Sequence, residues 1–168
     1  MSKRREYQYC PMCSTALIEQ ERTGALRPIC PACDYTVYYD PKVAVVMLLV
    51  QNERVLLIKR GVDPQKGKWA LPAGFVNANE NPQEAAMREV LEETNLVAKH
   101  PRLLDVFHNP GDGSADIIIA YQLEWMGGEL LAGDDALEAA WFTEDELPPT
   151  AFLTTHWLLE RWKKHTLY

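Results

Sequence analysis

Three glutamates, at positions 89, 92 and 93, have the spacing that places carboxylates on one side of a helix. Residues 82–94 are expected to form that helix, because Asn81 suits an N-cap, Pro82 suits the first helical position, and no Gly or Pro follows. Carboxylates this close repel one another, by about 0.2–0.5 kcal/mol per pair in an isolated helix. A divalent cation bound by oxygen ligands would remove that repulsion. The pattern therefore indicates either a magnesium-type metal site or an acidic helix face in solvent.

The other side of this helix is apolar on a helical wheel drawn at about 100° per residue. It is formed by Met87, Val90, Leu91 and Thr94. We therefore expect this side to pack on a core and the three glutamates to lie opposite it. Asn95 follows the helix and suits the left-handed conformation that commonly ends one.

A longer motif surrounds the helix, with further residues at fixed distances from the glutamates. Its specified positions read Gly74, five residues, Glu80, seven residues, then Arg88-Glu89-Val90-x-Glu92-Glu93-x-Asn95-Leu96. This spacing resembles the box of the Nudix hydrolases, G-x5-E-x7-R-E-U-x-E-E-x-G-U, where U is bulky and apolar. The sequence departs from the box only at Asn95, where the family has Gly, and Asn also tolerates the left-handed conformation.

The resemblance implies an activity, because Nudix hydrolases cleave a nucleoside diphosphate linked to another moiety. By the same resemblance, Glu89, Glu92 and Glu93 would hold Mg²⁺ or Mn²⁺ ions, which neutralise the pyrophosphate and activate a water molecule. Either Glu89 or Glu92 would serve as the general base.

Other residues of the motif receive supporting roles from the resemblance. Arg88 would orient a neighbouring carboxylate through a charge-assisted hydrogen bond. Glu80 would brace the loop that precedes the helix. Gly74 would allow the backbone to approach the cation closely, and the carbonyl of Ala73 would be a further metal ligand.

Two acids farther along the chain are candidates for one more metal ligand. Family members often use an acid from a loop after the box, and in the branch with a zinc ribbon it lies a few residues before an aromatic pair. Trp141-Phe142 resembles that pair, so Asp135 and Glu138 both qualify. The alternative, that both are surface acids of a loop, stays open.

Substrate contacts are expected from Arg60, by pairing with phosphate, and from Trp69 or Phe107, by stacking, although either aromatic ring could belong to the core instead. The NADH pyrophosphatases resemble this chain in joining a zinc ribbon to a Nudix domain. They carry a downstream S-Q-P-W-P-F-P-x-S signature that is missing here. We therefore expect hydrolysis of ADP-ribose or FAD with release of AMP. NADH hydrolysis, nucleotide sensing without turnover, and a zinc-ribbon adaptor for RNA or protein are the alternatives.

Four cysteines occur as two C-P-x-C pairs in the first 33 residues. This spacing is typical of a four-thiolate zinc ribbon, which leaves no open coordination position and is therefore structural. Two disulfides and redox-active pairs are the alternatives. Such turns often carry Gly after the second cysteine, where this chain has Ser14 and Asp34. The expected zinc ligands are Cys10, Cys13, Cys30 and Cys33.

Composition limits the partners of the chain. The residues are 47% hydrophobic and 24% charged, with a net charge of −7, which does not favour nucleic acid or an anionic membrane. A small phosphate-bearing substrate remains compatible, because a bound cation reverses the local field. No apolar run approaches the ~20 residues of a membrane span, and the N-terminus lacks the apolar segment of a secretory signal. A cytoplasmic protein is expected.

The chain is expected to contain a zinc ribbon at residues 1–39 and a Nudix domain at residues 40–168. The apolar run 43–50 predicts a strand buried on both faces. Further strands are expected at residues 15–18, 26–29, 55–58, 102–108, 116–125 and 138–142. A second helix is expected at residues 152–164, with Leu153, Trp157 and either Leu158 or Leu159 facing inward.

Strands on both sides of a helix, with a second helix at the end, predict an α/β fold with a mixed sheet covered on both faces. This agrees with the α/β/α sandwich that the Nudix resemblance implies. The resemblance also implies a homodimer, for which Trp125, Met126, Leu130 and Leu131 are candidate contact residues unless they belong to the core.

Overall fold

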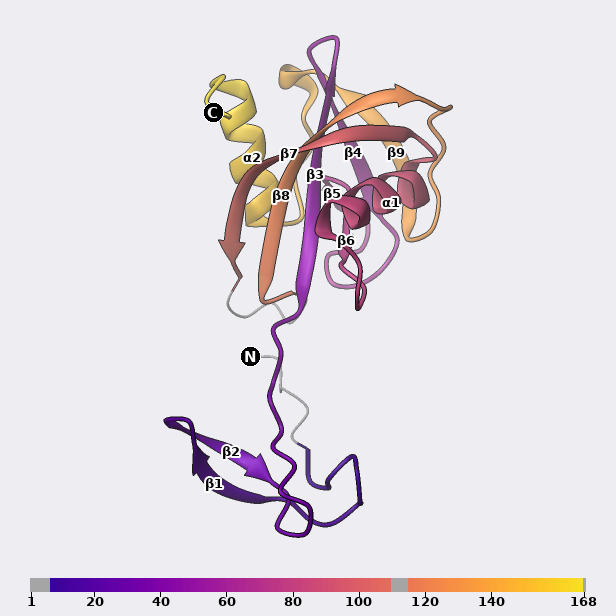
Figure 1. Cartoon of the computed structure of the whole chain (residues 1–168). Coiled ribbons are helices and arrows are strands. Elements are labelled where there is room, and N and C mark those ends of the chain that lie inside the picture. The colour runs from indigo at the N-terminus through magenta and orange to yellow at the C-terminus, as the bar shows by residue number, and fades with distance from the viewer. Residues whose placement is uncertain (1–6, 110–114, 168) are drawn as a thin grey trace. The chain divides into compact units, whose positions relative to one another are not determined.

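The structure is a computed structural model that describes residues 7–109 and 115–167 (Figure 1). The described chain falls into two compact units that meet in sequence between Pro41 and Lys42. Within the described residues, no helix is both long enough and apolar enough to cross a membrane.

The first unit contains one antiparallel hairpin, formed by β1 (Ile18–Arg22) and β2 (Ala25–Ile29). Thr23 and Gly24 turn it with φ values of 53° and 77°, the conformation that two-residue hairpin loops favour. The strand expected at residues 15–18 is wrong, because the backbone there closes the first cysteine turn instead. Thr15 O accepts from Cys10 N, and Leu17 N donates to Gln8 O.

Within the described residues, the second unit contains seven strands and two helices. The strands are β3 (Val43–Gln51), β4 (Arg54–Arg60), β5 (Trp69–Ala70), β6 (Ala73–Phe75), β7 (Val97–His108), β8 (Ile117–Gly127) and β9 (Ala136–Phe142). The helices are α1 (Pro82–Thr94) and α2 (Leu153–Lys163), and a 3₁₀ turn, Glu144–Glu146, precedes α2.

The sheet is mixed, as predicted, and β3 lies at its centre. β3 pairs in parallel with β8 and antiparallel with β6, and β7 continues the sheet antiparallel to β8. β3 and β4 pair only beside their turn, at Val50–Val55 and Gln51–Arg54. β4 then pairs with β5 and β9. The gap that opens between β3 and β4 leaves room for β6, which carries the loop into α1.

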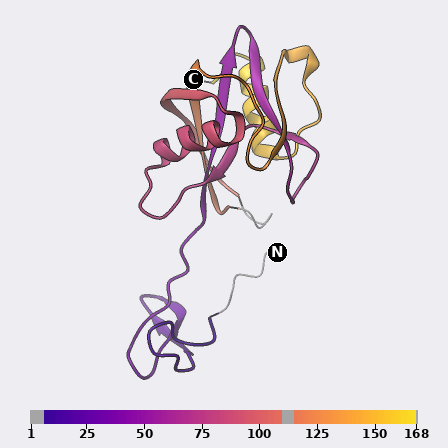
Figure 2. The same ribbon diagram turned by 90° about the vertical axis from the view of Figure 1, so that its right-hand side faces the viewer.

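Alternate residues of β3 fill two separate cores, one on each face of the sheet. Val45, Met47 and Leu49 pack beneath α1, whereas Val46 and Leu48 pack beneath α2. Figure 2 shows the two helices on opposite sides of the strands. The predicted strand buried on both faces is therefore confirmed, as is the α/β/α sandwich.

Helix α1 has the predicted limits. The side chain of Asn81 accepts a hydrogen bond from Gln83 N, Pro82 occupies the first turn, and Asn95 adopts the left-handed conformation with φ 57°. These three residues set the position of every side chain between them.

The face that α1 buries differs from the predicted one. Leu91 is 48% exposed, whereas Glu89 is only 8% and Glu93 only 4% exposed. Two small residues, Ala85 and Ala86, are fully buried beside Val90 and Thr94. Because alanine brings the helix backbone close to the sheet, the buried arc rotates toward the alanines, and two of the glutamates rotate inward with it.

Helix α2 also buries a narrower face than predicted. Leu158 and Leu159 are buried, as expected, together with Thr155, whose hydroxyl accepts from Leu71 N at 3.4 Å. Leu153 and Trp157 are exposed, so the expectation that they face inward is wrong.

Candidate functional site

Arg88 is the centre of a hydrogen-bonded cluster that joins α1 to the preceding loop. Its Nε and Nη2 atoms donate to the two oxygens of Glu80 at 2.6 and 2.9 Å, a two-point pair. Its Nη2 atom also donates to Phe75 O at 3.0 Å, and Glu80 accepts from Asn77 N at 2.8 Å. These contacts lower the pKa of Glu80 to about 2, chiefly through Arg88. Glu80 therefore ties the loop to the helix.

The remaining Arg88 nitrogen faces two of the box carboxylates. Nη1 donates to Glu89 Oε1 and to Glu92 Oε2, both at 2.7 Å. One guanidinium thus fixes the positions of three carboxylates, from Glu80, Glu89 and Glu92. Among the described residues, no hydrogen bond is made to the second oxygens of Glu89 and Glu92, which leaves these atoms for other ligands.

Glu93 points toward β6 rather than toward Arg88. Its Oε2 accepts a hydrogen bond from Ala73 N at 3.0 Å, so the amide of Ala73, and not its carbonyl, contacts this carboxylate. Burial, with smaller contributions from the charges of Glu89 and Asp134, raises the pKa of Glu93 to about 8, although the hydrogen bond from Ala73 N acts in the opposite direction. Burial also raises the pKa of Glu89. A cation in this cluster would favour the ionised form of both acids.

Gly74 gives the Glu89 carboxylate the room it occupies. Gly74 pairs with Val45 in β3, and a β-carbon added to it would overlap the carboxyl group of Glu89. No residue with a side chain fits there without moving the glutamate. Glycine at this position therefore allows Glu89 to keep its observed place against β6.

The connection between β8 and β9 runs along the end of α1 and brings in an acid that the sequence analysis missed. Gly133 N donates to Glu93 O at 3.0 Å, and the negative charge of Asp134 raises the pKa of both Glu89 and Glu93. Asp134 adopts φ 45°, a left-handed conformation that Asp tolerates better than most residues. In the sequence around Asp134, the Gly133-Asp134 dipeptide indicates a turn, but nothing there indicates a site residue.

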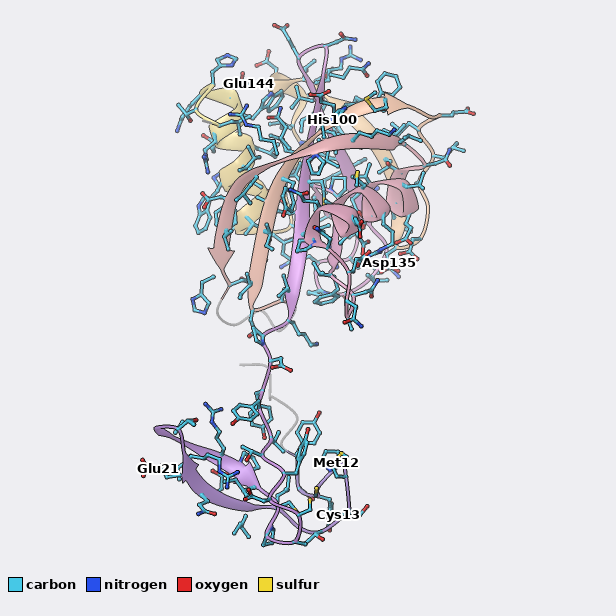
Figure 3. The ribbon with its side chains drawn as sticks, viewed as in Figure 1. Met12, Cys13, Glu21, His100, Asp135 and Glu144 are labelled. Carbon is cyan, nitrogen blue, oxygen red and sulfur yellow. The ribbon has the colours of Figure 1, made fainter. Side chains whose placement is uncertain are left out.

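The two acids predicted from the aromatic pair have other contacts. Glu138 forms an ion pair with Lys59 at 2.7 Å. Asp135, which Figure 3 labels in the connection that passes beside α1, accepts from Gly61 N through its backbone carbonyl at 2.6 Å. Asp134, the neighbour of Asp135 in this connection, is an acid whose charge acts on both Glu89 and Glu93.

Arg60 lies at the end of β4 on the side of the box carboxylates. Its positive charge lowers the pKa of Glu93, which opposes the effect of burial. Its Nε donates to Pro64 O at 2.9 Å, and its guanidinium lies 4.9 Å from the ring centre of Phe152. Arg60 therefore also holds the loop that follows β4.

The two aromatic candidates both pack on the α2 side of the sheet. Trp69 meets Phe142 edge-on, with ring centres 4.8 Å apart, and Lys59 Nζ lies 6.0 Å from its ring. Phe107 packs 5.8 Å from Trp157 of α2. Phe107 therefore lies on the opposite face of the sheet from α1 and is not brought to the box.

The four cysteines converge within the first unit. Their sulfur atoms all lie within 4.8 Å of one another, and all four residues are free thiols. Cys10 and Cys30 are buried, whereas Cys13 and Cys33 are exposed. Four thiols gathered in this way can hold a metal ion.

Comparisons with known proteins agree with this geometry. The NUDIX domain family matches residues 39–162. An ADP-ribose pyrophosphatase of Methanocaldococcus jannaschii is 45% identical over 120 residues, which cover 70% of this chain and 71% of that protein. An NAD-capped RNA hydrolase of Pseudomonas fluorescens is 28% identical over 148 residues, which cover 86% of this chain. The chain spans about half, 51%, of that relative's length.

A solved structure resembles almost the whole chain. The NUDIX hydrolase of Nitrosomonas europaea superposes with a TM-score of 0.85 at 32% sequence identity, covering 95% of this chain and 92% of that one. The box residues gather around Arg88 on a sandwich of the same architecture. The chain therefore belongs to the NUDIX domain family.

Proposed function

We propose that this protein is a divalent-metal-dependent pyrophosphohydrolase that cleaves ADP-ribose, FAD or a similar ADP-linked compound and releases AMP. The observation that carries the proposal is the carboxylate cluster, in which Arg88 orients Glu89 and Glu92 while Glu93 lies buried beside them. The 45% identity to a protein named ADP-ribose pyrophosphatase supports this choice of substrate class.

The donor atoms of the cluster fit hard divalent cations. Glu89, Glu92 and Glu93 offer carboxylate oxygens, the ligands that Mg²⁺ and Mn²⁺ prefer. Asp134 joins them as the loop acid in preference to Asp135 and Glu138, because its charge acts on Glu89 and Glu93. The ions would neutralise the pyrophosphate and provide an activated water molecule.

The protein residues have separate tasks in this proposal. Glu80 fixes the guanidinium of Arg88, and Arg88 in turn fixes one oxygen of Glu89 and one of Glu92. Either of these two glutamates can accept the proton of the attacking water through its second oxygen. Holding the base still before the reaction reduces the reorganisation that the transition state requires.

Substrate binding is assigned to the residues around Arg60. The positive charge of Arg60 acts on Glu93. Arg60 could therefore pair with the pyrophosphate of a substrate bound at the metal site. Trp69 remains a candidate stacking residue, because it pairs across β5 and β4 with Lys59, the neighbour of Arg60. Phe107 is left out, because its ring packs on α2.

The thiols of the first unit are proposed to bind zinc. In a regular tetrahedron with Zn–S bonds of about 2.3 Å, sulfur atoms are about 3.8 Å apart. The sulfur distances here are 3.4 Å for Cys13–Cys30, 3.6 Å for Cys13–Cys33 and 3.7 Å for Cys10–Cys33. Four thiolates leave no position for substrate, so this zinc would be structural.

A hydrolysis panel with Mg²⁺ and with Mn²⁺ tests the proposed activity. It contains ADP-ribose, FAD, NADH, NAD⁺, diadenosine polyphosphates and nucleoside triphosphates, with products identified by chromatography. We expect AMP from ADP-ribose or FAD, and a loss of orders of magnitude in Glu93→Gln. Glu84→Gln, in the exposed first turn of the same helix, is the matched control. Nucleotide binding without any turnover would refute the proposed hydrolase activity and favour a nucleotide sensor.

NADH or NAD-capped RNA is the second candidate substrate class. The observation in its favour is the similarity to NAD-capped RNA hydrolases, which covers 86% of this chain. Faster cleavage of NADH than of ADP-ribose in the panel would establish this alternative. It would also show that the missing downstream signature is not needed.

A homodimer is proposed as the assembly. Of the four candidate contact residues, Trp125 and Leu130 pack against the core beneath α1, which leaves the exposed Met126 and Leu131 as the better candidates. Light scattering on the purified chain, compared with Met126→Lys, tests this. A monomer at every concentration would refute it.

A further inference from the structure

The two cysteine turns of the first unit have nearly the same backbone. The residue after the second cysteine is left-handed in both, with φ 59° at Ser14 and 58° at Asp34. Ser14 N donates to Cys10 O at 2.8 Å, and Asp34 N donates to Cys30 O at 2.9 Å. Side chains disfavour this conformation, so each turn needs an interaction that retains it.

The side chains at these matched positions differ in what they contact. Asp34 forms a two-point ion pair with Arg22, at 2.6 Å to Nη2 and 3.2 Å to Nη1. Arg22 Nη1 also donates to Thr36 Oγ1 at 2.8 Å, just beyond the second turn. Arg22 belongs to β1, so the guanidinium attaches the hairpin to the second cysteine turn.

The first turn has no matching attachment. Among the described residues, Ser14 makes no side-chain hydrogen bond, and the nearest polar contact, from Cys13 Sγ to Thr15 Oγ1 at 3.3 Å, stays inside the turn. The first turn is therefore held by backbone hydrogen bonds, whereas the second has the same bonds and a clamp from another strand.

We propose that Arg22 is a positioning residue that makes the two halves of the metal centre unequal. When metal is withdrawn, the turn of Cys10 and Cys13 opens first, while Arg22 keeps the turn of Cys30 and Cys33 closed. The inference rests on the proposed binding of zinc by the four cysteines. It adds an order of release that the four-thiolate pattern alone does not contain.

Because the Arg22–Asp34 ion pair is exposed, its contribution should be small and should depend on salt concentration. The side chains of Arg22 and Asp34 are 33% and 76% exposed, so water and salt screen the pair. Exposed pairs of this kind change an opening equilibrium by only roughly 1.4- to 5-fold. The difference between the turns should therefore be a few-fold, and it should shrink at 1 M salt, where the Debye length is about 3 Å.

The test follows which thiols react as zinc leaves. The zinc-loaded full chain is treated with a chelator and N-ethylmaleimide, and the alkylated cysteines are identified by mass spectrometry over time. We expect Cys10 and Cys13 to be modified a few-fold earlier than Cys30 and Cys33 at low salt. In Arg22→Gln and in Asp34→Asn the pair of Cys10 and Cys13 should react no earlier than the pair of Cys30 and Cys33. Zinc release, followed with a colorimetric chelator, should be faster.

Arg27→Gln is the matched control, because Arg27 lies in the same hairpin but stacks on Tyr38, 4.8 Å from its ring centre, instead of pairing with Asp34. It should keep the order of modification. Arg22→Lys keeps the charge without the two-point geometry and should lie between wild type and Arg22→Gln, which gives a second reading if Arg22→Gln loads zinc poorly.

Simultaneous reaction of all four thiols in the wild type, or an unchanged order in Arg22→Gln, would overturn the inference. Zinc content is measured before alkylation. A chain that takes up no zinc refutes the proposed metal centre itself, and the two failures are thereby distinguished. Hydrolase activity, carried by the second unit, is not used as a readout.

Discussion

Gly74 lies so close to the carboxyl group of Glu89 that a β-carbon at position 74 would occupy the same space. The contact joins β6, which carries Gly74, to the helix that carries the proposed metal ligands. The position of Glu89 therefore depends on the absence of a side chain on the neighbouring strand.

We expect Gly74→Ala to displace Glu89 and to lower kcat/KM by about 100-fold, the order of effect that a 1 Å misplacement has in an active site. Glu84→Gln, in the exposed first turn of the helix that carries Glu89, is the control variant. Steady-state rates with ADP-ribose and Mg²⁺ would measure both. Full activity in Gly74→Ala would show that Glu89 has no fixed position.

Glu80→Gln should lower kcat with little change in KM. The substitution weakens the two-point pair that holds Arg88, so that Glu89 and Glu92 lose their orientation while the substrate contacts remain. We expect kcat to fall by up to about 100-fold, the order of effect that a small misplacement of catalytic groups has. A rise in KM alone would instead place Glu80 among the substrate contacts.

Asp134→Asn should weaken the binding of Mn²⁺ more than Asp135→Asn or Glu138→Gln does. The reason is that the charge of Asp134 reaches Glu89 and Glu93, whereas Glu138 pairs with Lys59. We expect a loss of about 10- to 100-fold in metal affinity, the range found for residues that support metal ligands. Calorimetric titration of the three variants would rank them, and a larger effect of Glu138→Gln would favour the acid that the sequence motif suggests.

The stability of the protein without added Mg²⁺ or Mn²⁺ should fall as pH rises from 5.5 to 7.5. Burial raises the pKa of Glu93 to about 8, from the usual 4.5. Between these values the folded chain holds a proton that the unfolded chain has released, so raising the pH favours unfolding. The slope contributed by one such proton is at most about 1.4 kcal/mol per pH unit.

Denaturant unfolding followed by tryptophan fluorescence would measure this slope, because all five tryptophans lie in the second unit. Glu93→Gln should flatten it, and Glu84→Gln should leave it unchanged. Saturating Mg²⁺ should stabilise the protein more at high pH, because metal ligands bind in the deprotonated form. An equal slope in wild type and Glu93→Gln would contradict the raised pKa.

Features that depend on neighbours in the chain could be predicted from the amino-acid sequence. Asn81, Pro82 and Asn95 set the limits of α1, because capping is a local interaction. The spacing of the box placed Arg88, Glu89 and Glu92 within one turn of each other, where they form ion pairs. The apolar run of β3 predicted a strand covered on both faces.

Predictions from local sequence patterns were wrong where tertiary packing determines which residues are buried or where a strand begins. The wheel of α1 placed Leu91 inward and Glu93 outward, since it ranks residues by hydrophobicity alone. Only the structure shows that two alanines let the helix approach the sheet and that Ala73 N meets the Glu93 carboxylate. β7 begins at Val97 rather than at residue 102, because Pro101 and the irregular pairing around it conceal the strand pattern.

Distance along the chain concealed the rest of the site. Asp134 lies about forty residues after the box, and it reaches Glu89 and Glu93 because the connection from β8 to β9 hydrogen-bonds to the end of α1. Phe107 lies much nearer to the box in sequence, yet it packs on the other face of the sheet. The sequence thus fixes which chemical groups are present and how the box is spaced, whereas long-range packing decides which distant groups join them.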